Sequence, residues 1–284
     1  MHLNNKVLNE NVNYAYYEEK YQLGEQHDRL LDILTEFDAF CRKNDIHYSL
    51  ADGTLLGAIR HADFIPWDDD ADVMMTRAEY ERLKKVLTPD TKVQMCKVCF
   101  LDRITLRGYG EQGLYMDMFI NEDMPESKPV FAWMKFKTRF LRTYFNKIES
   151  MNARHSDYRG LKKLTQSILG TVGHAMVSLL IGKRDIFEVN DKAVAIRKHR
   201  PSGFYTRFTS RMYETNRRFN KQSYEEGYAD ILFRGKRLMA IKNAKVFLHE
   251  MYGNFDSMPP EEKRVPEHSI NMLEAPADCK KWFN

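Results

Sequence analysis

Residues 50–74 read Leu-Ala-Asp-Gly-Thr-Leu-Leu-Gly-Ala-Ile-Arg-His-Ala-Asp-Phe-Ile-Pro-Trp-Asp-Asp-Asp-Ala-Asp-Val-Met, and this stretch decides most of what the sequence predicts. The turn Gly53-Thr54 follows an apolar run and opens a short helical segment. Carboxylates then crowd together directly before an apolar strand, at Asp68, Asp69, Asp70 and Asp72. Their mutual repulsion costs stability unless cations offset it, so a divalent metal that brings a phosphorylated ligand is the simplest partner.

The flanking segments predict a mixture of helices and strands. Apolar residues recur at spacings of three and four over residues 17–43, which predicts a helix. Residues 46–50 and 72–75 read as short strands, and Thr76 with Glu79 forms a capping box that starts another helix. Several strands follow between residues 91 and 119.

The pattern of the later residues predicts a helical lobe followed by a segment with both helix and strand. Residues 127–200 read as helical, and a strand at 236–241 precedes a helix at 243–252. We therefore expect an α+β fold with a mixed sheet, flanking helices and a basic accessory lobe. The expected units are a catalytic core at 1–126, a basic helical insertion that serves the acceptor at 127–200, and a segment at 201–284 that completes the catalytic domain.

Composition excludes several classes of protein. The 284 residues are 43% hydrophobic and contain four cysteines, which fits a chain with a sizeable core in a reducing compartment. We find neither a secretory signal nor a run of 18 apolar residues, and predict a cytoplasmic protein, with the inner face of the cytoplasmic membrane as an alternative place. Residues 131–200 hold 15 Lys or Arg against 5 Asp or Glu, so the positive charge is concentrated there.

The strongest chemical signal is the pair Asp70 and Asp72, whose side chains share one side of an extended segment. If the strand of Asp117 lies beside that of Asp72, three carboxylates converge, as two-metal phosphoryl chemistry requires. Gly53 and Thr54 offer backbone N–H groups and a hydroxyl to phosphate at a helix start. The alternative is a solvated turn at Asp70 and an ordinary turn at Gly53.

Other residues are weaker candidates for a functional site, because structural roles explain them as well. Cys96 and Cys99 have the spacing of zinc ligands, but a strand with two reduced cysteines is the better interpretation. Arg103 and Arg107 are candidates for phosphate contact or exposed strand residues. No Gly-rich phosphate loop and no dinucleotide fingerprint occurs in the sequence.

The segment Gly53-Thr54-Leu55-Leu56-Gly57-Ala58-Ile59-Arg60-His61, followed by Phe64-Ile65-Pro66-Trp67-Asp68-Asp69-Asp70-Ala71-Asp72, closely resembles the LicD family. This family contains phosphocholine transferases of bacterial surface glycans and fukutin-related ribitol-phosphate transferases. The resemblance covers about residues 28–85 and extends more weakly to Asp117 and to Tyr252-Gly253. It departs from the family at Asp52, where glycine is frequent, and at Ala62-Asp63, where Lys-Gly is more usual.

The resemblance implies a nucleotidyltransferase-like core and a reaction that moves a substituted phosphate, such as phosphocholine, from a CDP-linked donor to a sugar hydroxyl, with release of CMP. Metal ligands for Mg²⁺ or Mn²⁺ would be Asp70, Asp72 and Asp117. Asp117 or Asp68 would take the acceptor's proton. Donor-binding residues would be Gly53, Thr54, Arg60 and Trp67, although Arg60 is equally a surface residue and Trp67 is better explained as part of the core. Asp69 is interpreted as loop structure.

We therefore predict a CDP-alcohol-dependent phosphotransferase of the LicD type that modifies a cell-surface glycan such as lipopolysaccharide or teichoic acid. Two alternatives stay open: a nucleotidyltransferase that moves NMP to a small molecule, and a non-catalytic glycan- or membrane-binding protein. The expected partners are a CDP-linked alcohol and a glycan acceptor, and a lipid-linked acceptor is one alternative. No nucleic acid is expected. The apolar stretch Ile168–Ile181, with basic residues on both sides, predicts either a buried helix of the lobe or a contact with a membrane surface.

Overall fold

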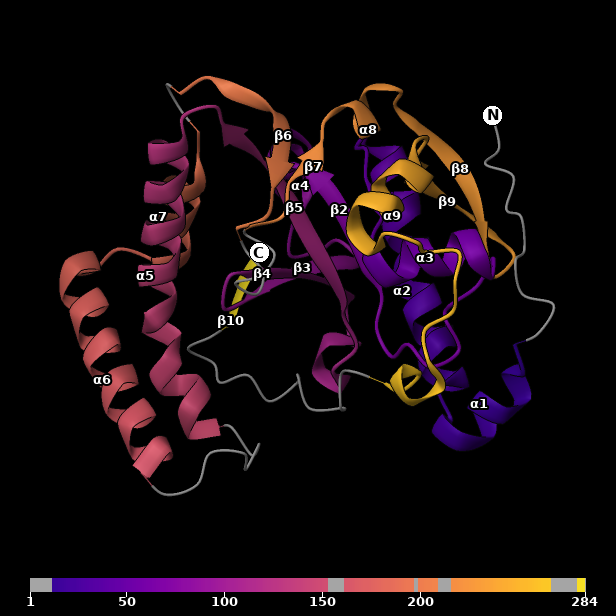
Figure 1. Ribbon diagram of the computed structural model, residues 1–284, viewed down its shortest axis with the longest axis horizontal. Coiled ribbons are helices and arrows are strands. Elements are labelled where there is room, and N and C mark those ends of the chain that lie inside the picture. Colours follow the sequence, from indigo (N-terminus) through magenta and orange to yellow (C-terminus); the bar gives the residue numbers. More distant parts are fainter. Residues whose placement is uncertain (1–11, 153–160, 197–198, 209–215, 267–279, 284) are drawn as a thin grey trace.

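A mixed sheet forms the centre of the protein, whose computed structural model describes residues 12–152, 161–196, 199–208, 216–266 and 280–283 (Figure 1). Its strands follow the order β1-β2-β5-β4-β3-β10. Their bounds are Ser49–Leu50, Asp72–Thr76, Met116–Pro125, Leu101–Leu106, Val93–Val98 and Lys280–Phe283. The carboxyl-terminal half of β5 also pairs with β6 (Pro201–Thr206), which pairs with β7 (Phe219–Asn220). A separate hairpin joins β8 (Tyr228–Phe233) to β9 (Lys236–Ile241).

The pairing of β2 with β5 is parallel and sets the position of the candidate site. Asp72 lies opposite Asp117 in this register, and Val73 lies opposite Met118. Neighbouring residues in a parallel pair point to the same face of the sheet, so the two carboxylates lie side by side. The next three residues of β2 are fully buried. A parallel strand that is covered on both faces requires such a continuous apolar run.

Helices of the amino-terminal half cover the sheet and surround the same core. Helix α2 (Gly24–Lys43) packs against β3, β4, β5 and β9, and its buried face includes Leu30, Leu34 and Phe37. Helix α3 (Asp52–Arg60) lies between the short β1 and β2 in the chain and contacts both strands. Helix α4 (Arg77–Val86) begins at the predicted cap, because the Thr76 side chain accepts a hydrogen bond from the backbone N–H of Glu79.

Three helices form a lobe at one side of the molecule. They are α5 (Lys128–Asn152), α6 (Leu161–Ile181) and α7 (Ile186–Val194). Their own apolar cluster includes Leu141, Phe145 and Val177, separate from the core of the sheet. In Figure 1 α6 is the outermost helix of this lobe, and α5 separates it from the sheet.

The carboxyl-terminal part returns to the core of the sheet and then crosses the front of α3. Helix α8 (Gln222–Glu225) precedes the β8–β9 hairpin, and α9 (Ala244–Tyr252) buries Phe247 and Leu248 against the core. The chain then runs through the short helix η3 (Glu261–Lys263) toward α1 (Tyr14–Tyr21), as Figure 1 shows. The Tyr21 hydroxyl donates a hydrogen bond of 2.9 Å to the backbone oxygen of Arg264.

The predicted α+β class with a mixed sheet and flanking helices is confirmed. The single helix predicted for residues 17–43 is wrong in one respect: α1 ends at Tyr21, the next residue Gln22 has a left-handed φ of 54°, and α2 starts at Gly24. The strand predicted at 46–50 is confined to β1, and a short helix η1 (Gly110–Gln112) interrupts the run of strands before β5. The division at 126 and 200 into three units stays a prediction.

Candidate metal and donor site

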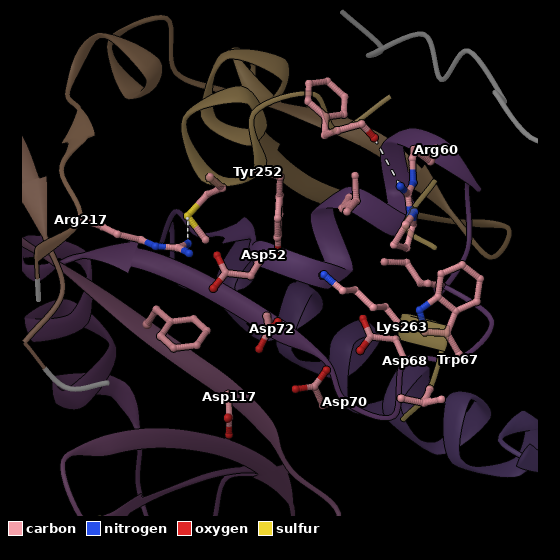
Figure 2. Close-up of a pocket in the computed structure, with 18 of the residues that line it drawn as sticks. Asp52, Arg60, Trp67, Asp68, Asp70, Asp72, Asp117, Arg217, Tyr252 and Lys263 are labelled. Carbon is pink, nitrogen blue, oxygen red and sulfur yellow. Dashed lines mark hydrogen bonds between the residues drawn. The ribbon is translucent and has the colours of Figure 1, made fainter. Parts of the chain in front are cut away.

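A cavity of about 760 Å³ opens beside the parallel strand pair. Charged side chains of both signs line it, and Figure 2 shows many of them. The acidic residues are Asp52, Asp68, Asp70, Asp72 and Asp117. The basic residues are Arg60, Arg103, Arg142, Arg217 and Lys263. Such a cavity suits a ligand that carries negative charge and is held partly through a cation.

Three of the carboxylates meet at the floor of the cavity. Asp70, Asp72 and Asp117 each offer an oxygen atom, and these atoms lie within 4.8 Å of one another. Asp70 precedes β2, Asp72 begins it, and Asp117 comes from β5, so the parallel register creates the cluster. Figure 2 shows the three side chains converging. Carboxylate oxygens are the ligands that Mg²⁺ and Mn²⁺ prefer, and the donor set therefore fits a hard divalent cation.

The cluster is electrostatically unfavourable without a cation. Asp72 is buried, and burial together with the negative charges of Asp70, Asp52, Asp117 and Asp68 raises its pKa well above the usual value. A bound cation would reverse this effect because it favours the ionised carboxylate. The electrostatics thus agree with the ligand chemistry of the cluster.

Arg103 holds one member of the cluster in place. Its Nε donates a hydrogen bond of 2.7 Å to Oδ1 of Asp117, and the two residues lie opposite each other on β4 and β5. Arg103 is 3% exposed, so the interpretation as an exposed strand residue is wrong. One oxygen of Asp117 is thereby oriented by a fixed guanidinium. Arg107, in contrast, lies outside the cavity lining and donates to the backbone oxygen of Pro89.

Asp52 and Arg207 form a buried ion pair that sequence reasoning missed. Nη1 of Arg207 lies 3.0 and 2.8 Å from the two carboxylate oxygens of Asp52. The guanidinium is fully buried and stacks over the rings of Phe119 and Phe219, with its centre 4.4 and 4.7 Å from their centroids. The two residues are 155 positions apart in the sequence, so no local sequence pattern predicts their contact.

The backbone at Asp52 has a conformation that glycine adopts most easily. Asp52 has a φ of 40°, a left-handed conformation that glycine adopts without strain and aspartate tolerates better than most residues. This conformation costs free energy, and it occurs at a residue that lines the cavity. The ion pair with Arg207 fixes the side chain in that position.

Gly53 leaves space for the carboxylate of Asp68. A Cβ atom at position 53 would lie 2.4 Å from Oδ2 of Asp68, closer than real contacts allow. Gly53 and Asp68 both line the cavity, so the glycine lets a carboxylate from the Pro66-Trp67 loop lie across the start of α3. His27 anchors this loop, because its Nε2 lies 2.7 Å from the backbone oxygen of Asp68.

The side chain of Thr54 is buried and makes a structural hydrogen bond, so it is not exposed to the cavity. Its side chain is 2% exposed, and its hydroxyl accepts a hydrogen bond of 2.8 Å from the backbone N–H of Asp72. This bond ties α3 to the first residue of β2 and so helps to place the carboxylate. Thr54 does not line the cavity, and its predicted contact with phosphate stays a prediction.

Arg60 and Trp67 lie at the wall of the cavity. Arg60 is buried and its Nη1 donates to the backbone oxygens of Phe255 and Ser257, at 3.3 and 3.5 Å. The interpretation of Arg60 as a surface residue is therefore wrong, because it holds the carboxyl-terminal segment against α3. Trp67 is 7% exposed and packs on the ring of Tyr17, in agreement with a role in the core.

The carboxyl-terminal segment supplies further side chains that the sequence did not single out. Tyr252 and Lys263 come from α9 and η3, and Arg217 precedes β7 (Figure 2). Partial burial raises the pKa of Tyr252 well above its usual value, and the carboxylates of Asp52, Asp72 and Asp68 add to this effect. The only local signal was the Tyr252-Gly253 pair, which ends α9.

The cysteines show no sign of a zinc site within the described residues. Cys96 is buried in β3, and burial raises the pKa of its thiol to about 12. Cys99 is partly exposed between β3 and β4. In the described part of the chain, the one cluster of metal-ligating side chains is that of Asp70, Asp72 and Asp117. Among the described helices, none is both long and apolar enough to cross a membrane.

Fold and site together define an α+β protein with an acidic cavity suited to a divalent cation and an anionic ligand. Residues 45–153 match the family model described as "LicD/FKTN/FKRP, nucleotidyltransferase domain". This match confirms the resemblance to the LicD family over that part of the chain.

Curated relatives extend the comparison beyond this domain. The chain is 28% identical to the lipopolysaccharide cholinephosphotransferase LicD of Haemophilus influenzae over 273 residues, 88% of this chain and 97% of that protein. It is also 26% identical to an uncharacterised protein of Rickettsia prowazekii over 118 residues, 38% of this chain and 44% of that protein. The similarity to the Haemophilus protein thus extends well beyond the matched domain.

Proposed function

We propose that this chain is a metal-dependent phosphotransferase that moves phosphocholine from CDP-choline to a sugar hydroxyl of a cell-surface glycan and releases CMP. The convergence of Asp70, Asp72 and Asp117 in a cavity with basic walls carries the proposal. The similarity to a lipopolysaccharide cholinephosphotransferase along 88% of the chain supports the transferred group and the class of acceptor. A cytoplasmic location, free or at the inner face of the membrane, belongs to the same proposal.

The acidic cluster would bind Mg²⁺ or Mn²⁺, which would neutralise the donor's diphosphate and stabilise charge on the leaving CMP. Arg103 keeps the Asp117 carboxylate oriented toward this cluster. Thr54 fixes the backbone of Asp72 at the start of β2. These contacts hold two ligands before any donor arrives, which reduces the ordering cost of binding.

Basic side chains around the cluster would hold the donor's phosphates. Arg217 and Lys263 approach from the carboxyl-terminal segment, and Arg142 comes from α5 of the lobe. Backbone N–H groups at the start of α3 add a partial positive charge near Gly53. The cavity of about 760 Å³ is of the size that small-molecule ligands occupy.

Proton removal from the acceptor hydroxyl would fall to Asp68 or Asp117. Asp68 lies across Gly53 and lines the cavity without being one of the three clustered ligands. Asp117 is held by Arg103 and belongs to the cluster. The metal ligands have to stay coordinated to the cation, so a cavity carboxylate outside the cluster is the better candidate to take the proton, and we favour Asp68.

Tyr252 would contact the choline group. It is 43% exposed, whereas Trp67, Phe119 and Phe255, the other aromatic residues that line this part of the cavity, are at most 9% exposed. The face of an aromatic ring attracts a quaternary ammonium group. This argument favours choline over ribitol or glycerol as the donor's alcohol.

Thermal unfolding with nucleotides tests the proposal. We expect CDP-choline to raise the melting temperature in the presence of Mg²⁺ or Mn²⁺ by about 5–10 °C at a concentration near one hundred times Kd. CDP-ribitol, CDP-glycerol, CTP and ATP serve as comparisons. The shift should vanish in Asp72→Asn and persist in the matched variant Asp90→Asn, whose carboxylate is exposed and outside the cavity.

The other outcomes separate the alternatives. A metal-dependent shift with CTP or ATP alone would favour transfer of a nucleotide and contradict the phosphocholine proposal. A shift with CDP-ribitol alone would retain the reaction and change the donor. If no nucleotide stabilises the protein at any metal concentration, a non-catalytic role is the better explanation.

A further inference from the structure

The helical lobe presents a continuous apolar face to solvent. Six side chains of α6 are at least half exposed, although all are large and apolar, and two of α5 accompany them. We call these residues the lobe face: Trp133, Phe136, Ile168, Leu169, Val172, Met176, Leu179 and Leu180. Leu169 and Leu179 are 70% and 86% exposed. Isolated exposed apolar residues are ordinary, but a patch of this extent marks an interaction surface.

The geometry of α6 explains why these residues share one side. Gly173 faces α5, because a Cβ atom there would lie 2.9 Å from the Thr143 side chain. Val177 and Ile181 are buried on the same side of α6 as Gly173. The exposed residues from 168 to 180 recur at helical spacing on the opposite side, over a length of about 20 Å. In Figure 1 this helix forms the outer edge of the molecule.

A groove of about 610 Å³ continues the lobe face across α5 toward α7. Trp133, Phe136 and Leu180 line it, so the groove and the exposed side of α6 are contiguous. The rings of Trp133 and Phe136 stack with centroids 5.4 Å apart. Tryptophan settles at the boundary between water and lipid, and phenylalanine is typical of the apolar face of helices that lie in that boundary.

Positive charge surrounds this apolar surface. Lys137 and Lys192 line the groove, and Lys183 and Arg184 follow directly after α6. Helix α6 itself contains no acidic residue. The acidic residues at the start of α7 are engaged elsewhere: Asp185 and Glu188 lie within 4.0 Å of Lys281.

We infer that the lobe face docks on the surface of an anionic lipid bilayer, with the side of α6 that carries Leu169 and Leu179 lying in the interface. A face that is apolar at its centre and basic at its rim matches acyl chains beneath anionic headgroups. A second copy of the chain fits less well, because it would bring the same lysines against each other. Since no described helix is able to cross a membrane, the contact is peripheral.

One helix contributes both to the lobe face and to the cavity. Arg142 of α5 lines the cavity, while Trp133 and Phe136 of the same helix belong to the lobe face. Membrane docking and the proposed reaction are tested separately, because binding of donor and metal is measured without lipid and binding to vesicles is measured without donor.

Vesicle flotation tests the inference. We expect the purified chain to float with vesicles of phosphatidylcholine and phosphatidylglycerol and to bind vesicles of phosphatidylcholine alone at least tenfold more weakly, as electrostatic attraction requires. The double variant Leu169→Glu/Leu179→Glu should lower binding by about tenfold or more. Lys183→Gln and Lys192→Gln should each lower it about fivefold at low salt.

Val246→Glu is the matched control, because Val246 is 49% exposed on α9, outside the lobe face and the cavity lining. It should float like the unmodified chain. Each variant is first checked for an unchanged melting temperature and an unchanged shift with metal and CDP-choline. Full binding by Leu169→Glu/Leu179→Glu, or no binding to anionic vesicles, overturns the inference. Conversion of a dimer to a monomer by that variant, without vesicle binding, would instead assign the face to contact between copies.

Discussion

The buried ion pair between Asp52 and Arg207 gives the sharpest stability prediction. Arg207→Met removes the guanidinium but keeps most of the side-chain volume among Phe119 and Phe219. The change leaves the Asp52 carboxylate 8% exposed beside the acidic cluster and without this partner. Breaking a buried pair in this way costs about 3–5 kcal/mol. We expect the lower end, because Asp52 borders the cavity and retains some contact with water.

Urea and thermal unfolding of the metal-free protein measure this effect. For a chain of this size a loss of about 3 kcal/mol lowers the melting temperature by roughly 6–12 °C. The control is Arg29→Met, which removes a pair with Glu25 whose side chains are 40% and 79% exposed and is expected to cost at most about 0.5 kcal/mol. The double variant Asp52→Asn/Arg207→Met should recover part of the loss, since it leaves no buried charge. Equal stability of Arg207→Met and Arg29→Met would refute the argument.

Three further predictions concern the cavity itself. The pKa of Asp72 is raised in the folded, metal-free protein, so the folded state still binds a proton that the unfolded chain has released above about pH 4. The free energy of unfolding therefore falls as pH rises through the folded pKa of Asp72, by up to about 1.4 kcal/mol per pH unit. Urea unfolding without metal should therefore show Asp72→Asn to be more stable than the unmodified chain near pH 8 and not at pH 4; equal profiles would argue against the assignment. Gly53→Ala should displace the Asp68 carboxylate and lower kcat by roughly one hundredfold if Asp68 is the base, with a change in melting temperature of only a few degrees; unchanged turnover would exclude Asp68. Tyr252→Leu should raise KM for CDP-choline about tenfold while Tyr252→Phe stays near the original value, and steady-state kinetics that show no difference would remove the ring from choline recognition.

Much of the acidic site was predictable because its parts are close in sequence. Gly53, Asp68, Asp70 and Asp72 fall within one segment, and a strand side-chain period of two places Asp70 and Asp72 together. The position of Asp117 needed one assumption, that its strand lies beside that of Asp72, and the parallel register bears this out. Local spacing and one pairing were therefore sufficient to bring the three carboxylates together.

The remaining features depend on contacts between distant segments. Arg207 reaches Asp52 only through the β5–β6 pairing and the packing of three aromatic rings, for which the sequence offers no pattern. The burial of Arg60 was not predictable, because its partners are backbone oxygens of residues 255 and 257, far away in the sequence. The break between α1 and α2 was missed since Gln22 adopts a left-handed conformation without a glycine to signal it. The burial of Arg103 follows from its place in a central strand, which alternation alone did not reveal.

The exposure of α6 shows why an apolar stretch does not by itself distinguish a buried helix from a surface one. The apolar stretch Ile168–Ile181 is compatible with both, because both need apolar residues, and it favours the buried helix. The structure leaves Leu169 and Leu179 exposed and buries only the side that faces α5. The surface thus follows from the packing of the lobe rather than from the composition of the helix.

The most direct test of the central claim follows both products of the transfer. CDP-choline labelled in the choline group is incubated with Mg²⁺, the chain and a lipopolysaccharide acceptor, and the label on the acceptor is compared with the CMP released. We expect equal amounts of both for the unmodified chain and for Asp90→Asn, and neither for Asp72→Asn. Transfer of a nucleotide to the acceptor, or label transfer that survives in Asp72→Asn, would contradict it.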